Sequence, residues 1–358
     1  MISLYRYRIP LHRPFRAGQS GPDRTWTQRE GLILRIPTPA GEFAAEAAPL
    51  PGFSADTLDE VVNEARTLLP ELKKLLEQPP DEESFRTFLN RPLFPSLSFA
   101  LSSLFLQLLQ HQELTEPNRA PTTTLTINGV IPRGTPDEMR QAIDERYRQG
   151  YRTLKLKSGP DPSALFTVIR EAAGHHPDLI FRIDANASWP AGRAREWLKQ
   201  FYSLPVEYCE EPCRYRSFTE AARLYRDSPL PIALDESLAS VSDIRQALYE
   251  KACTVVILKP TRLGNLFELI DLAHSIATDP QPEWILTTTL ETAIGRMAVT
   301  KLAVRIGTPG RAHGLDTGRL FRKDLLRDEP APTRVIYQND PWLPLFEQCK
   351  TDDLIPIP

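Results

Sequence analysis

Short β-rich runs alternate with amphipathic helical patterns from about Thr124 to Thr317, and this alternation constrains the fold more than any other feature. It is typical of parallel βαβ units. The β-rich runs cover residues 124–130, 153–157, 180–186, 206–212, 231–237, 254–260, 284–291 and, less clearly, 313–317. Helical patterns follow at residues 163–173, 190–202, 217–226, 241–250, 263–277 and 293–306. Eight such runs predict an α/β fold built on a (β/α) barrel.

The helix after the first run has its own start signal. Thr135-Pro136-Asp137-Glu138 supplies an N-cap, a proline at the first helical position and a capping-box glutamate. An open doubly wound sheet would show the same alternation, but no Gly-rich dinucleotide turn follows the first run. The barrel is therefore the favoured architecture.

The residues before the barrel predict a separate α+β unit. Its strand-like runs lie at residues 4–9 and 31–36 around a polar stretch at 18–29, and its helical patterns lie at 55–76 and 96–110. A chain of 358 residues is long enough for about two domains. We predict a capping domain at residues 1–120, a catalytic barrel at 121–322, and a C-terminal segment at 323–358 that packs back on the capping domain.

Charge and hydropathy exclude several kinds of partner. A formal net charge of −3, without any Lys/Arg run, leaves no basic surface for nucleic acid. Charged residues interrupt the N-terminus before a signal-peptide core, and no segment approaches the ~20 apolar residues of a membrane span. We expect a cytoplasmic protein with a small-molecule substrate, no nucleic-acid or membrane partner, and an oligomeric state that composition leaves open and that is compatible with a monomer.

The cysteines predict no metal centre. Cys209 and Cys213 are four residues apart, but neither Cys253, Cys349 nor a nearby histidine completes a zinc set. We expect all four to be reduced and structural.

Charged residues stand at the ends of five consecutive predicted strands. They are Lys157, Asp184, Glu210, Asp235 and Lys259, and successive members are 27, 26, 25 and 24 residues apart, so each step is one βα unit. The active site of a (β/α) barrel forms at the carboxyl ends of its strands. A single strand-end acid is more often a solvated loop charge, but five charges in the order Lys, acid, acid, acid, Lys indicate an active site.

The three acids predict a metal site. Carboxylates at one barrel mouth repel one another unless a cation neutralises them, and oxygen ligands select Mg²⁺ or Mn²⁺ over zinc. We therefore expect Asp184, Glu210 and Asp235 to bind one divalent ion. Lys157 and Lys259 come from strands on opposite sides of the acids, an arrangement suited to proton transfer.

Two further residues share the inner face of these strands. Lys155 lies two before Lys157, and both point into the barrel if Leu154 and Leu156 face the helices. Nearby positive charge is then expected to lower the pKa of Lys157, whereas the alternative is a pair of lysines on a solvated edge strand. Arg182 lies two before Asp184 and either binds a substrate carboxylate through its guanidinium fork or forms a structural ion pair to one of the carboxylates.

Five short motifs resemble those of the muconate-lactonizing subgroup of the enolase superfamily, in which lysine bases act with Mg²⁺. They are Lys155-Leu156-Lys157, Asp184-Ala185-Asn186, Glu210-Glu211-Pro212, Asp235-Glu236-Ser237 and Lys259-Pro260-Thr261. Two other segments resemble the o-succinylbenzoate synthase family in particular. They are Ala48-Pro49-Leu50-Pro51-Gly52-Phe53-Ser54, followed by Thr57-Leu58, and Gly314-Leu315-Asp316-Thr317. The resemblance spans nearly the whole chain and implies a modified TIM-type (β/α)7β barrel.

The resemblance also implies roles and a reaction. Lys157 takes the place of the base and Lys259 that of the residue that stabilises the intermediate, while Asp184, Glu210 and Asp235 hold Mg²⁺, for which Mn²⁺ can substitute. The reaction implied is the dehydration of 2-succinyl-6-hydroxy-2,4-cyclohexadiene-1-carboxylate to o-succinylbenzoate in menaquinone biosynthesis.

Substrate specificity is less constrained by these residues. Thr287 and Thr288, expected to bind substrate with Lys155 and Arg182, stand where the family usually has serines. The same lysines would serve an N-succinylamino acid racemase or a dipeptide epimerase, whereas a non-catalytic barrel is disfavoured because all five strand-end charges are present. We expect the loops at 18–29 and 49–54 to cover the mouth, although a structural role between domains is equally open for 49–54.

Overall fold

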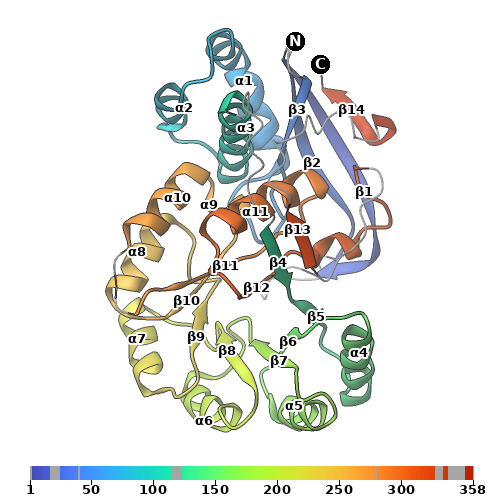
Figure 1. The fold of residues 1–358 in the computed structure, drawn as a ribbon, viewed down its shortest axis with the longest axis vertical. Coiled ribbons are helices and arrows are strands. Elements are labelled where there is room, and N and C mark those ends of the chain that lie inside the picture. The colour runs from blue at the N-terminus through green and yellow to red at the C-terminus, as the bar shows by residue number, and fades with distance from the viewer. Residues whose placement is uncertain are drawn as a thin grey trace.

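The computed structural model describes residues 2–16, 25–38, 41–113, 123–276, 278, 280–326, 334–337 and 351–357. These residues form two units, with an antiparallel sheet and three helices at the top of Figure 1 and a larger parallel α/β unit below. Among the described residues, no helix is long and apolar enough to cross a membrane.

The smaller unit is a four-stranded antiparallel sheet in the order β14-β1-β2-β3. Its strands are β1 (Ser3–Arg16), β2 (Thr25–Thr38), β3 (Gly41–Ala47) and β14 (Leu354–Ile357), and its helices are α1 (Leu58–Leu76), α2 (Glu82–Leu89) and α3 (Pro95–Glu113). A continuous core of buried apolar side chains joins the helices to the sheet. Sequence patterns predicted neither β3 nor the eight-residue α2.

The C-terminal strand belongs to this smaller unit. Leu354 pairs with Tyr7 and Ile357 with Leu4, so β14 lies beside β1 (Figure 1). The remainder of the segment predicted at 323–358 lies outside the described residues, apart from 323–326, β13 (Arg334–Tyr337) and the short 3-10 helix Thr351–Asp353.

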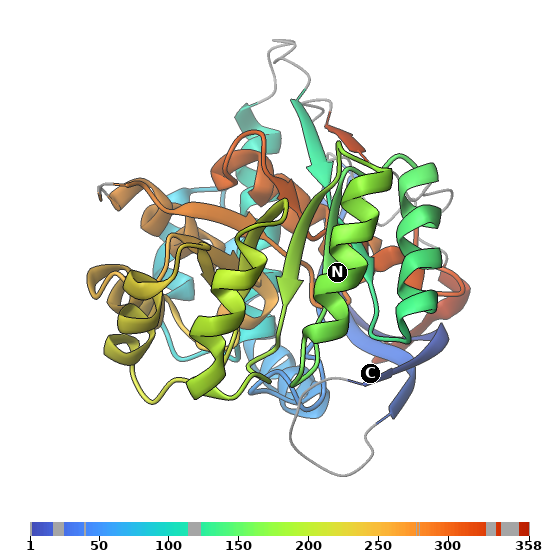
Figure 2. The same ribbon diagram turned by 90° about the horizontal axis from the view of Figure 1, so that it is seen from below.

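The larger unit contains a seven-stranded parallel sheet whose spatial order follows the chain from β5 to β11. The strands are β5 (Gly129–Ile131), β6 (Thr153–Lys157), β7 (Ile180–Asp184), β8 (Val206–Glu210), β9 (Ile232–Leu234), β10 (Val255–Leu258) and β11 (Glu283–Leu286). The helices are α4 (Pro136–Arg148), α5 (Ser163–His175), α6 (Ala191–Phe201), α7 (Phe218–Asp227), α8 (Val241–Tyr249), α9 (Pro260–Leu263), α10 (Leu266–Ser275) and α11 (Ala293–Ile306). The sheet is curled, and Figures 1 and 2 show helices around its outside.

A second, three-stranded sheet lies at the free edges of this curled sheet. It consists of β12 (Ala312–His313), β4 (Thr123–Ile127) and β13, with β12 parallel to β4. On one side Gly314 N donates to Leu286 O at 2.9 Å, and on the other Asn128 N donates to His313 O at 3.0 Å. Backbone hydrogen bonds thus connect β11 through β12 to the start of β5.

Local signals explain much of this architecture. Thr135 caps α4 with a complete capping box, as its sequence predicted. Leu154 and Leu156 of β6 are fully buried against the helices, so Lys155 and Lys157 face the inside of the curled sheet. The run at 124–130 is divided at Asn128 into β4 and β5, and the run at 313–317 passes into the 3-10 helix Asp316–Leu320.

The described cysteines agree with the prediction of structural thiols. Cys209, Cys213 and Cys253 are buried and free, and burial raises the pKa of each thiol, to about 11 for Cys213. Cys349 lies outside the described residues.

Candidate active site

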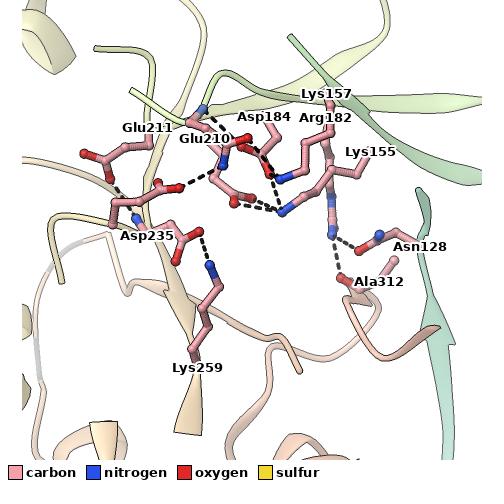
Figure 3. Close-up of polar contacts among 12 residues, drawn as sticks. Asn128, Lys155, Lys157, Arg182, Asp184, Glu210, Glu211, Asp235, Lys259 and Ala312 are labelled. Carbon is pink, nitrogen blue, oxygen red and sulfur yellow. Dashed lines mark hydrogen bonds and ion pairs between the residues drawn. The ribbon is translucent and has the colours of Figure 1, made fainter. Parts of the chain in front are cut away.

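Strand register brings the predicted charges together. Lys157 is paired in register with Asp184, and Asp184 is paired with Glu210, so three consecutive strands end at one level. Asp235 and Lys259 are the first residues after β9 and β10. Figure 3 shows these side chains pointing toward one another.

Lysine ammonium groups hold the three carboxylates. Lys155 Nζ lies 2.8 Å from both carboxylate oxygens of Glu210 and 2.8 Å from Asp184 Oδ2. Lys157 Nζ donates to Asp184 Oδ2 at 2.6 Å, and Lys259 Nζ donates to Asp235 Oδ2. The carboxylates are almost completely buried, so these contacts lie in a medium of low polarity where charge pairs interact strongly.

These contacts set the protonation of the site. Burial by itself would raise the pKa of Asp184, but Lys155 and Lys157 hold it below its ordinary value. Burial and the charge of Asp184 raise the pKa of Glu210 well above its ordinary value. Although burial opposes its charged form, Asp184 and Glu210 raise the pKa of Lys155. Lys155 is therefore a poor base, and its charge serves to hold the carboxylates.

Lys157 and Lys259 approach the carboxylates from opposite sides (Figure 3). Lys157 also donates to Asn186 Oδ1 at 3.1 Å, which fixes its ammonium at the end of β6. Lys259 Nζ lies 4.6 Å from the centre of the Phe53 ring, which is a cation–π contact with the segment between β3 and α1. The predicted pair of lysines across one centre is thus present in the geometry.

Lys155, Lys157 and Lys259 line a cavity of about 1860 Å³ that both units enclose. Thr287 and Thr288, for which substrate binding is predicted, line it from the end of β11. The loop at 49–54 contributes Leu50 and Phe53, which favours a role at the mouth over a purely structural one. Of the other predicted loop, residues 18–24 lie outside the described residues, and 25–29 form part of β2.

Arg182 does not line the cavity, which corrects the prediction that it binds substrate. Its side chain is fully buried below the site. The guanidinium donates to Glu207 Oε2 at 2.5 Å and to Ala312 O at 2.7 Å, and it lies 4.8 Å from the Tyr208 ring. The period-2 rule gave the correct face of β7, but Arg182 lies one layer deeper than Asp184. The structure therefore favours the structural ion pair, although with Glu207 and not with a carboxylate of the site.

Glu211, the neighbour of Glu210, turns away from the lysines. Its backbone φ is +41°, and its carboxylate accepts hydrogen bonds from Asp235 N at 2.9 Å and from the Ser237 hydroxyl. Burial raises the pKa of Glu211 to about 7. Glu211 therefore supports the segment that carries Asp235.

Sequence patterns missed two residues of the four-stranded antiparallel sheet that bind the backbone at the edge of the cavity. Arg29 of β2 donates to Leu290 O at 2.9 Å and to Pro49 O at 2.7 Å. Glu46 of β3 accepts from Thr292 N and Gly295 N, both at 2.9 Å, at the start of α11. Neither residue carries a motif, since only tertiary packing brings these strands to the barrel.

The donor set fits a hard divalent cation in chemical type. Asp184, Glu210 and Asp235 offer only carboxylate oxygens, and Asp235 Oδ1 is buried with no hydrogen-bond partner in the described part of the chain. Within the described part of the chain, no three acidic, imidazole or thiol groups stand ready to hold a metal as the side chains lie. The lysine ammonium groups occupy the hydrogen-bonding positions of these oxygens instead.

Fold and site together define a member of the enolase superfamily. A family model described as "Enolase C-terminal domain-like" matches residues 138–338. Among solved structures, N-succinyl Arg/Lys racemase from Bacillus cereus superimposes with a TM-score of 0.81 at 18% identity, covering 98% of this chain and 97% of that one. That level of identity supports the shared fold alone.

Relatives that match nearly the whole chain identify one family within the superfamily. A model described as "MenC, N-terminal domain" matches residues 1–108. An o-succinylbenzoate synthase from Edwardsiella ictaluri is 30% identical over 352 residues, which cover 94% of this chain and 96% of the relative. The o-succinylbenzoate synthase of Thermosynechococcus elongatus, solved with Mg in its active site, superimposes with a TM-score of 0.70 at 21% identity over 90% of this chain and 94% of that one. The chain belongs to the o-succinylbenzoate synthase family.

Proposed function

We propose that this chain dehydrates 2-succinyl-6-hydroxy-2,4-cyclohexadiene-1-carboxylate to o-succinylbenzoate, the reaction of the family to which it belongs. The observation that carries the proposal is the placement of Lys157 and Lys259 on opposite sides of three buried carboxylates beside one large cavity. Two amines across one point can remove a proton from a carbon and stabilise the charge that remains.

Lys157 is the base in this proposal. It removes the proton from the ring carbon that bears the carboxylate, after the substrate has displaced its hydrogen bond to Asp184. Lys259 stabilises the negative charge that develops on the substrate, and Phe53 shields this ammonium from water at one face. Departure of hydroxide from the neighbouring ring carbon, with a proton returned by Lys157, completes the loss of water and makes the ring aromatic.

Asp184, Glu210 and Asp235 are the residues that would hold a divalent metal ion, and the oxygen donors suit Mg²⁺, with Mn²⁺ able to substitute. Such a cation supplies positive charge for a substrate carboxylate and for the charge that builds up there as the proton leaves. The orphaned Oδ1 of Asp235 supports this assignment. Lys155, which contacts two of the three proposed ligands, keeps their charges compensated and lies within reach of substrate at the cavity surface.

We also propose that the curled sheet closes into a (β/α)7β barrel, with β12 as a strand between β11 and β4. The hydrogen bonds of Gly314 and Asn128 across this gap support closure. The proposal also includes the division into residues 1–120, 121–322 and 323–358, which the pairing of β14 with β1 supports. A cytoplasmic location is also part of the proposal, whereas the oligomeric state is left open and is compatible with a monomer.

A second function, racemisation of N-succinylamino acids, is favoured by the same pair of lysines, because a racemase needs a proton donor on each face of one carbon. The decisive experiment incubates the purified protein with the cyclohexadiene substrate and, separately, with a panel of N-succinylamino acids and dipeptides. We expect turnover of the cyclohexadiene to be the most efficient. Racemisation or epimerisation that exceeds dehydration in kcat/KM would replace the first function by the second.

A further inference from the structure

Arg133 is a cationic side chain at the cavity that has no partner among the described residues. It lies two residues beyond the end of β5 and lines the cavity. Within the described ranges no hydrogen bond or ion pair involves its guanidinium, and the side chain is exposed. Two other arginines of the cavity are engaged, since Arg146 donates to Gln149 at 2.8 Å and Arg319 donates to Asp316 at 2.8 Å.

The backbone after Lys157 makes room for this guanidinium. Ile131 is paired in register with Leu156, so Arg133 extends beside the residues that follow β6. A Cβ atom at Gly159 would lie 2.9 Å from Nη2 of Arg133 and 3.2 Å from its Cζ. The guanidinium therefore packs against Gly159, two residues from the proposed base, and a side chain at 159 would push it aside.

The acidic groups of the site do not reach Arg133. In the sheet order β5 borders β6 on the side away from β7, β8 and β9, which carry the three carboxylates. On the same side of the cavity, Asp316 accepts from Arg319 and from Tyr151 at 2.6 Å, and Glu145 accepts from Gln149 at 3.0 Å. Arg133 thus adds uncompensated positive charge to a concave surface near Lys157, and such a group favours an anionic ligand.

We propose that Arg133 binds the carboxylate at the end of the substrate's succinyl arm and so makes the enzyme selective for dicarboxylates. This inference rests on the proposed function. The ring carboxylate belongs between Lys157 and Lys259, which leaves the second carboxylate for the opposite part of the cavity, where Thr288, Gly314 and Arg133 follow one another from β11 to β5. A planar guanidinium can donate to both oxygens of that carboxylate in a paired geometry.

The test measures binding of the stable product, so that it does not depend on turnover. Calorimetry compares o-succinylbenzoate with the analogue whose distal carboxylate is a carboxamide. We expect Arg133→Met to weaken binding of the dicarboxylate roughly 10- to 100-fold, the usual loss for a charge-assisted pair. The carboxamide should bind wild type and variant equally. A similar loss for both ligands, or for neither, would overturn the proposal.

Two variants sharpen the assignment. Gly159→Ala keeps the charge but displaces the guanidinium, and we expect it to weaken dicarboxylate binding while carboxamide binding stays unchanged. Arg146→Met removes a cavity arginine that already has a partner, and we expect both affinities to stay as in wild type. Arg13 of β1 is the competing cation, since it also lines the cavity. A selective loss in Arg13→Met with none in Arg133→Met would overturn the assignment to Arg133. Product binding that survives without any dehydration would count against the proposed function alone.

Discussion

Lys155 lies 2.8 Å from both carboxylate oxygens of Glu210, although the two residues are 55 positions apart in the chain. The contact exists because β6, β7 and β8 are adjacent and in register. It places a permanent cation beneath two of the proposed metal ligands and gives the two lysines of β6 different tasks. Lys155 compensates charge, while Lys157, one pleat nearer the cavity, is available for proton transfer.

Removal of divalent ions should abolish activity. We expect no turnover in excess EDTA and recovery with Mg²⁺ or Mn²⁺, because the carboxylates then lack the cation that a bound substrate requires. Mg²⁺ should also raise the thermal midpoint of the free protein. At a concentration one hundred times its dissociation constant, it should add about 2.7 kcal/mol to the free energy of unfolding. Full activity in the chelator would remove the metal from the proposal.

Glu211 provides a matched control for the ligand assignment. Glu210→Gln should eliminate the Mg²⁺-dependent rise in thermal midpoint. Glu211→Gln should lower the midpoint without Mg²⁺, since it disturbs the contacts to Asp235 N and Ser237, yet keep the rise on adding metal. The opposite pattern would shift the ligand by one residue.

The sequence predicted the strand ends of this site well and its surroundings poorly. Lys157, Asp184 and Lys259 could be found because each ends a βα unit of nearly constant length, and period 2 then fixed the inward face of β6. No sequence pattern shows how far a residue lies from the cavity along its strand. Arg182 was therefore predicted on the correct face of β7 but at the cavity, whereas it lies one layer of side chains below it. The short strand β3 and the helix α2 were missed because neither spans enough residues to show a period.

Residues that reach the site from another unit had no local signal either. Arg29 and Glu46 contact the barrel through the packing of β2 and β3. Phe53, which meets Lys259 across the cavity mouth, differs from them because it lies in the loop at 49–54 that the sequence did place there. Arg133 lies in a loop where nothing in the sequence distinguishes it from a solvated charge. Arg29 and Glu46 are found only when the two units are packed together, and Arg133 only when the ends of β5 and β6 are placed side by side.

Arg182→Met should mainly cost stability. It leaves the partly buried Glu207 without one of its two arginine partners, and we expect a loss of about 3 kcal/mol in the free energy of unfolding. The folded fraction should keep near-normal KM, since Arg182 does not line the cavity. Urea unfolding and steady-state kinetics on the same preparation test this. Unchanged stability with severely reduced turnover would restore the substrate-binding role.

Glu46→Gln should lower the stability of the fold and also weaken substrate binding. The Glu46 carboxylate accepts from Tyr7 OH at 2.6 Å and from the first amides of α11, and an amide nitrogen in its place would face donors. We expect a loss of about 2 kcal/mol and a raised KM, because residues 287–290 at the cavity edge precede this helix. Arg86→Met, which breaks an exposed ion pair to Asp271 of α10, should change neither. Equal kinetics in both variants would separate Glu46 from the cavity.

His313 should make stability fall in mild acid. Burial, aided by Arg182, lowers the pKa of His313 from 6.5 to about 4, and its Nδ1 accepts a hydrogen bond from Leu286 N at 3.1 Å. Between these two pH values the unfolded chain binds the proton and the folded chain does not, so stability is complete above pH 6.5 and declines toward pH 4. The contribution is roughly 2 kcal/mol between pH 6.5 and 4.5. His313→Asn, which keeps an acceptor but cannot titrate, should flatten this part of the urea-derived stability profile; an unchanged slope would assign it to other groups.

Substitutions of Lys157 and of Lys259 should impair different steps of the reaction. A syn elimination needs one base that also acts as the acid, whereas racemisation needs a proton donor on each face of the carbon. Lys157 stands alone on its face, because Lys155 is held by Glu210 and Asp184 with a raised pKa. Lys259 faces the same centre from the other side.

Lys157→Ala should therefore lose both dehydration and the exchange of the α-proton with solvent. Lys259→Ala should be severely impaired in dehydration, since the developing charge loses its ammonium partner, but should retain slow deuterium exchange into an N-succinylamino acid of the configuration that faces Lys157. Mass spectrometry of each enantiomer in deuterated buffer measures the exchange, and circular dichroism checks that both variants are folded. Lys155→Met serves as the comparison, because it should impair metal-dependent stabilisation as well as turnover. Exchange that survives in Lys157→Ala and disappears in Lys259→Ala would place the base on the opposite face, at the end of β10.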